Sequence, residues 1–105
     1  VHYLNAGMTD CPLKRQQEAD FMTGFDTGFG ARHAEALSRI GARFGLDYLV
    51  IDCAEMPDGR LLVFEVDPGA VVHSMDPEEM FPYKHPAMRR VRQAFRALLA
   101  RQAGR

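Results

Sequence analysis

The chain of 105 residues, with 47% hydrophobic residues and a formal net charge of -1, has the composition of one globular domain. A chain of this length buries only about 65% of the surface that its unfolded form exposes, so it holds one modest core. Its longest apolar runs are far shorter than the roughly 20 residues of a membrane-spanning helix, which excludes that class. Two cysteines without metal-binding spacing favour a reducing, cytoplasmic setting.

The small net charge conceals a division along the chain. Residues 47–79 hold nine acidic residues and one arginine, a net charge of -8, whereas residues 84–105 hold seven basic residues and no acid, a net charge of +7. The arginines of the second segment are typical of a solvated helix face. A nucleic-acid contact is the less favoured alternative, because no aromatic residues interleave with Arg89, Arg90, Arg92 and Arg96.

The first half of the chain predicts one strand and two helices. Residues 1–6 favour a strand, and Thr9-Asp10 provides cap residues for a polar helix over about 12–22. A glycine-rich stretch over 24–30 then breaks the chain. Apolar residues at helical spacing predict an amphipathic helix over about 31–44, on which His33 is expected to be partly buried.

The second half predicts a hairpin, an irregular connection and a closing helix. Two β-prone runs, 46–55 and 60–67, flank Pro57-Asp58-Gly59, where proline fixes φ and glycine accepts a positive φ. Residues 68–86 contain four prolines and predict an irregular connection. An apolar stripe predicts an amphipathic helix over about 86–102. A small antiparallel sheet, at about 46–67, packed with two amphipathic helices gives an α+β fold, with residues 1–105 as a single domain.

Three carboxylates of the hairpin, Asp52, Glu65 and Asp67, are candidate metal ligands. A two-residue turn at Asp58-Gly59 would place Asp52 opposite Glu65, whereas a three-residue loop would shift the register by one and separate them. Two like charges that face each other destabilise a sheet unless they are compensated. Mg²⁺ or Mn²⁺ would compensate them, because both prefer hard oxygen ligands and complete their coordination with water and phosphate. A solvated sheet face is the alternative.

The stretch Leu46–Pro68 resembles the C-terminal metal-binding hairpin of the ATP-grasp superfamily. That pattern is an aspartate, a hairpin with an acidic-glycine turn, and then Glu-x-Asn at fixed spacing. Asp67 stands at the asparagine position, and Val50 stands where many members carry an arginine. The loop Val71–Ser74, the pair Tyr83-Lys84 and the closing helix also resemble superfamily members of the carboxylate-amine ligase type.

The resemblance implies a subdomain and a ligand set. Asp52 would bind one Mg²⁺, Glu65 would bridge two, and Asp67 would hold the second, with ATP as the nucleotide. His73 and Lys84 would contact the substrate or a phosphate. The reaction implied is ATP-dependent ligation of a carboxylate to an amine or a thiol through an acyl phosphate.

The resemblance also implies partners. An ATP-grasp site lies between two subdomains, so the chain is expected to be the C-terminal part of a longer protein, to need the N-terminal subdomains of that parent, and to be inactive alone. A degenerate, non-catalytic ATP-grasp module that serves protein interaction is the alternative. Because a missing neighbour leaves surface uncovered, we also expect the chain to form homo-oligomers.

Overall fold

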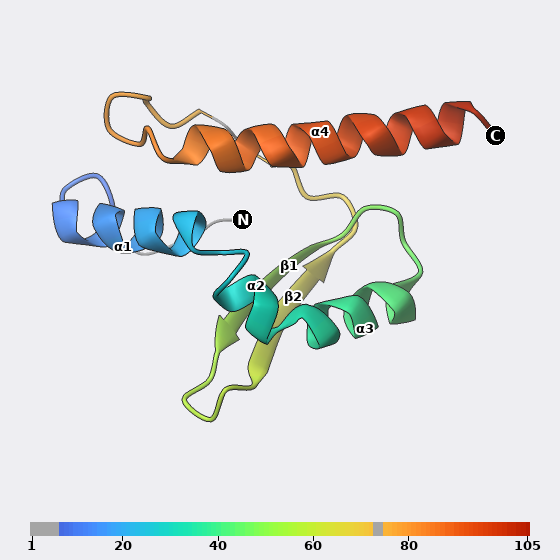
Figure 1. Cartoon of the computed structure of the whole chain (residues 1–105), viewed down its shortest axis with the longest axis horizontal. Coiled ribbons are helices and arrows are strands. Elements are labelled where there is room, and N and C mark those ends of the chain that lie inside the picture. Colours follow the sequence, from blue (N-terminus) through green and yellow to red (C-terminus); the bar gives the residue numbers. More distant parts are fainter. Residues whose placement is uncertain (1–6, 73–74) are drawn as a thin grey trace. The chain divides into compact units, whose positions relative to one another are not determined.

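The protein is a small α+β fold with one two-stranded antiparallel sheet (Figure 1). The computed structural model describes residues 7–72 and 75–105. These residues form two compact units, of which the first comprises residues 7–29 and 75–105 and the second residues 30–72. The elements are α1 (Pro12–Thr23), α2 (Phe29–Arg32), α3 (Ala34–Phe44), β1 (Val50–Glu55), β2 (Leu61–Asp67) and α4 (Lys84–Ala103). The strand predicted over 1–6 lies outside the described residues.

In the first unit, α1 packs against α4. The prediction of α1 is confirmed, and Pro12 occupies its first turn, where a missing N–H costs nothing. The predicted cap from Thr9 and Asp10 is wrong, because Cys11 occupies the N-cap position without a side-chain hydrogen bond. Instead the Arg15 guanidinium donates to the carbonyl oxygens of Met8 and Thr9 at 2.9 and 2.7 Å and ties the preceding turn to the helix.

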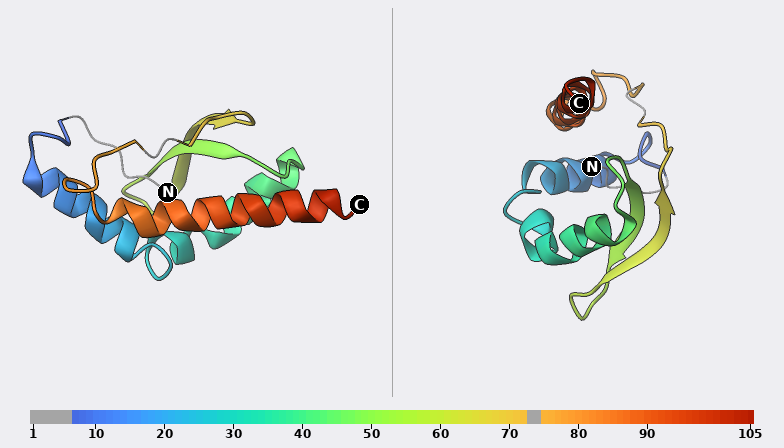
Figure 2. Two further views of the ribbon diagram at one scale, coloured as in Figure 1. Left: turned by 90° about the horizontal axis from the view of Figure 1, so that it is seen from above. Right: turned by 90° about the vertical axis from the view of Figure 1, so that its right-hand side faces the viewer.

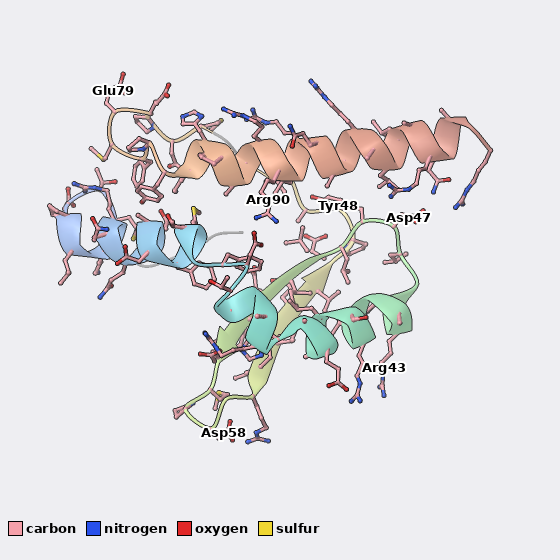
Figure 3. All side chains as sticks on the ribbon, viewed as in Figure 1. Arg43, Asp47, Tyr48, Asp58, Glu79 and Arg90 are labelled. Atoms are coloured by element: carbon pink, nitrogen blue, oxygen red, sulfur yellow. The ribbon has the colours of Figure 1, made fainter. Side chains whose placement is uncertain are left out.

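Aromatic rings and one ion pair hold the glycine-rich loop after α1. Phe21, Phe25 and Phe29 form a cluster with ring centroids 5.4 to 5.9 Å apart. The carboxylate of Asp26 accepts hydrogen bonds from both terminal nitrogens of Arg90 on α4, at 3.0 to 3.1 Å (Figure 3). The loop is therefore fastened to α4 as well as to α1.

The closing helix α4 is longer than predicted, because it begins at Lys84 rather than near residue 86. Pro86 lies in its first turn, where the lost N–H has no intrahelical partner in any case. Met88 on this helix and Phe81 just before it are buried. None of the helices in the described part of the chain combines the length and the apolar character that crossing a membrane requires.

In the second unit, α2 and α3 lie along one side of the hairpin (Figure 2). The segment predicted as one helix over 31–44 is divided at His33, between α2 and α3. Gly45 ends α3 in the left-handed conformation, with φ of 60°, and its N–H donates to the carbonyl oxygen of Gly41 at 3.0 Å, as glycine does at helix ends. The chain bends after Gly45, so β1 begins at Val50 and not at residue 46 as predicted.

The hairpin combines the two predicted registers. Its turn is the three-residue loop Pro57-Asp58-Gly59, in which the Gly59 N–H donates to the Met56 carbonyl at 2.9 Å and Gly59 has a φ of +84°. This loop pairs Glu55 with Leu61 and Cys53 with Val63. A β-bulge then adds Phe64 as an extra residue in β2, so Asp52 pairs with Glu65 and Val50 with Asp67. The bulge thus restores the opposition that the loop alone would remove.

Two glycine substitutions, one in this turn and one in α3, should change the free energy of unfolding in opposite directions. Gly59→Ala places a Cβ on a residue with positive φ, and we expect the free energy of unfolding to fall by about 1 kcal/mol. Gly41→Ala lies inside α3 with no atom within 4 Å of the new Cβ, and we expect a rise of about 0.5 kcal/mol or more. Urea denaturation of both variants measures the difference. Equal effects would contradict the assigned turn.

Candidate functional site

The candidate site is the hairpin face that carries Asp52, Glu65 and Asp67, here called the acidic face. Residues directly opposite in an antiparallel pair project to the same side, so Asp52 and Glu65 share this face, and Asp67 follows two residues later along β2. Asp52 and Glu65 are exposed, and Asp67 is half-buried. The hairpin therefore pairs Asp52 with Glu65, as the sequence predicted for one of its two registers, and places Asp67 further along the same face.

The three carboxylates differ in their hydrogen-bond partners within the protein. Asp67 Oδ1 accepts a hydrogen bond from the Gly69 N–H at 2.7 Å, which closes the turn that follows β2. The carboxylates of Asp52 and Glu65 make no hydrogen bond or ion pair with any other described residue. Asp52 also acts on its neighbour: burial, and then the nearby Asp52 carboxylate, raise the pKa of the Cys53 thiol. The acidic face therefore has uncompensated negative charge at the Asp52–Glu65 pair.

The acidic face is open rather than a closed metal cage. Over residues 7–72 and 75–105, no three His, Cys, Asp or Glu side chains lie close enough together to hold a metal ion. Mg²⁺ needs fewer protein ligands than that, because it commonly takes one or two carboxylates and fills its octahedron with water and substrate phosphate. The arrangement is suited to a cation that arrives with its own ligands, and not to one bound by this chain alone.

The other two predicted contact residues are His73 and Lys84. His73 lies outside the described residues, so its predicted contact is untested. Lys84 is placed in the first unit, with a side chain only 11% exposed. Its ammonium nitrogen lies 2.7 Å from Asp76 Oδ2 and 3.4 Å from Glu18 Oε1, and 4.4 Å above the Phe81 ring. Two carboxylates thus already neutralise Lys84, and its contact with phosphate remains a prediction.

Glu18 is the centre of the cluster around Lys84. Its side chain is fully buried, and Oε1 accepts a hydrogen bond from the Tyr83 hydroxyl at 2.6 Å. Oε2 has no partner among the described residues. Burial, and then the hydrogen bond to Glu18, raise the pKa of Tyr83, so its hydroxyl stays a donor. A buried carboxylate is not hydrated, so it needs a hydrogen-bond donor and a cation from the protein. This cluster therefore restricts how α1 and α4 can pack against each other.

A second charged cluster, which the sequence analysis did not identify, lies in the second unit. Glu55 at the end of β1 accepts hydrogen bonds from Arg32 Nε at 2.9 Å and from a terminal nitrogen at 3.2 Å. Glu55 Oε2 also lies 2.5 Å from His33 Nε2, and His33 is only 4% exposed, more buried than predicted. The cluster links the junction of α2 and α3 to the hairpin face opposite the acidic face. In the sequence, the adjacent basic residues Arg32 and His33 at the start of a predicted helix were the signal that could have indicated this cluster.

Comparisons of the chain with protein-family models, with curated proteins and with solved structures found no match. The resemblance to the ATP-grasp superfamily rests on the sequence of the hairpin and of the segment after it.

Removing the cation beside Glu18 should destabilise the protein. Lys84→Met leaves a fully buried carboxylate without its positive partner, and we expect the free energy of unfolding to fall by about 3 kcal/mol. The control is Arg101→Met, an exposed change on the same helix, with an expected effect within about 0.5 kcal/mol. Glu18→Gln added to Lys84→Met should recover part of the loss. A Lys84→Met variant as stable as the control would disprove the structural role of this cluster.

The cluster around Glu55 predicts a pH dependence. Hydrogen bonds from Arg32, and then from His33, lower the pKa of Glu55 below its usual 4.5. A carboxyl group whose pKa is lower in the folded state than in the unfolded state adds stability at pH values above its unfolded-state pKa. This contribution is lost as the pH falls through its folded-state pKa. Between pH 7 and pH 3 the wild type should therefore lose more unfolding free energy than Glu55→Gln. Parallel stability curves for the two proteins would contradict this assignment.

Proposed function

We propose that the acidic face supplies carboxylate ligands to a divalent cation, Mg²⁺ or Mn²⁺, that accompanies ATP. The observation that carries the proposal is the pairing of Asp52 with Glu65 on an exposed face where neither carboxylate has a protein partner among the described residues. Like charges directly opposite on neighbouring strands destabilise a hairpin, so a face that retains them favours a cation from outside. The open geometry suits a cation that brings phosphate oxygens as ligands.

In this proposal Asp52 and Glu65 are the ligands of one cation, and Asp67, whose Oδ1 accepts the Gly69 N–H, would use its other oxygen for the second ion that the resemblance implies. When bound, the cation would neutralise charge on the β- and γ-phosphates of ATP. The chain itself would bind and orient the cation; within the described residues of its unit, Asp52 and Glu65 remain exposed to water. The remaining parts of a nucleotide site would come from the N-terminal subdomains of the parent protein.

The reaction proposed for the parent is ligation of a carboxylate to an amine or a thiol, as the resemblance implies. The substrate carboxylate oxygen would bond to the γ-phosphorus while the bond from that phosphorus to ADP breaks. The amine or thiol would then bond to the acyl carbon, and inorganic phosphate would leave. Both cysteines are free thiols, which supports our placement of this ATP-dependent chemistry in the reducing cytoplasm.

A degenerate, non-catalytic module is the second candidate, favoured by one specific contact. The residue at the usual asparagine position is Asp67, which adds a negative charge near phosphate, and its Oδ1 is engaged by the backbone of Gly69. Val50 likewise removes an expected arginine. Release of ADP that depends on both a carboxylate and an amine, measured with the complete protein, distinguishes an active ligase from a module that only binds a partner.

The metal proposal is tested by a matched pair of charge-removing variants of the complete protein. Glu65→Gln removes a proposed ligand, and we expect the dissociation constant for ATP with Mn²⁺, measured by calorimetry, to rise at least about tenfold. Glu79→Gln removes an exposed acid from the loop before α4 (Figure 3) and should leave the dissociation constant within about twofold of the wild-type value. Equal affinity in Glu65→Gln and wild type would refute the proposal.

A further inference from the structure

The second half of α4 extends beyond the contacts that hold its first half. A helix of 20 residues is about 30 Å long, whereas the 12 residues of α1 span about 18 Å, so α1 can contact at most a little more than half the length of α4. The ion pairs that fasten α4 to its unit involve Lys84 and Arg90, both in its first seven residues. Further along, Leu99 is 54% exposed. The distal part of α4 therefore presents a partly apolar surface that the described residues of its own unit leave exposed at Leu99.

Three arginines lie along one side of this surface. Arg89, Arg92 and Arg96 are spaced by three and four residues, so they follow one line on the helix, and Leu99 continues it. All three arginines are exposed, and none has an ion pair with a described residue. Arg90 is different, because Asp26 holds its guanidinium. We call Arg89, Arg92, Arg96 and Leu99 the basic stripe.

The acidic face has the complementary composition. Leu62 pairs with Ala54 and lies on the same side as Asp52, the bulge brings Glu65 to that side as well, and Leu62 is 43% exposed. Phe64, the bulge residue itself, is 67% exposed. The hairpin therefore presents uncompensated carboxylates beside exposed apolar side chains, and α4 presents uncompensated arginines beside an exposed leucine. The uncompensated charges of the two surfaces are therefore opposite in sign, and both surfaces include exposed apolar side chains.

We propose that the basic stripe of one copy of this chain docks on the acidic face of a second copy. Arg92 and Arg96 pair with Asp52 and Glu65, and Leu99 packs near Leu62 and Phe64. Two α4 helices would not pair with each other, because residues 84–105 hold seven basic residues and no acid. In a two-fold arrangement the contact is made twice and closes as a dimer.

The docking stands independently of the proposed ATP chemistry, although it uses the same carboxylates. A divalent cation and the guanidinium groups would compete for Asp52 and Glu65, so the test is carried out in buffer with a chelator and no nucleotide. Failure to bind ATP with Mn²⁺ would then leave this inference unchanged, and a monomer would leave the ATP proposal unchanged.

Sedimentation velocity with charge-reversal variants tests the docking. The wild type should dimerise, and both Arg92→Glu/Arg96→Glu and Asp52→Arg/Glu65→Arg should raise the dissociation constant at least about tenfold by placing like charges together. An equimolar mixture of these two variants should form a heterodimer, because both of its contacts again join opposite charges. Circular dichroism confirms that each variant is folded.

The matched control is Arg101→Glu/Arg105→Glu, which changes the net charge equally at exposed positions outside the basic stripe and should preserve the dimer. A wild type that is monomeric at every concentration overturns the inference, as does a control that dissociates as fully as Arg92→Glu/Arg96→Glu. A monomer that binds a DNA duplex in low salt would assign the basic stripe to nucleic acid instead.

Discussion

The β-bulge at Phe64 determines which side chains share a face of the hairpin. With the three-residue loop alone, Asp52 would face the position before Glu65, and its carboxylate would project to the opposite side from that of Glu65. The extra residue restores the pairing of Asp52 with Glu65 and so brings Glu65 to the side on which Leu62 already lies. The proposed cation site and the proposed docking surface both depend on this single irregularity.

Charged clusters determine the local arrangement of the helices in each unit. Among the described residues the buried hydrophobic side chains are Phe81 and Met88, whereas Glu18, His33 and Lys84 are buried polar residues. With so small an apolar core, the satisfaction of buried charge decides which packing is stable. The Glu18–Lys84 cluster has this role in the first unit, and Glu55 with Arg32 and His33 has it in the second.

The sequence predicts elements better than it predicts the contacts between them. The hairpin, the helix α1, the end of α3 at Gly45 and the closing helix follow from local turn chemistry and apolar spacing. The bulge could not be predicted, because Phe64 has the same β-propensity whether it is paired or extra. The pairing of Lys84 with Glu18 joins residues far apart in the sequence, and no local pattern of charges indicates it.

The most direct test of the central claim, that Asp52 and Glu65 form one cation-binding pair on the acidic face, is paramagnetic broadening by Mn²⁺ bound to ATP in the amide spectrum of the ¹⁵N-labelled protein. The account predicts that substoichiometric Mn²⁺ with ATP first removes the signals of residues 51–53 and 64–67, on both strands together. Broadening that affects the acidic loop around Glu78 and Glu79 equally, or that reaches one strand without the other, would contradict it.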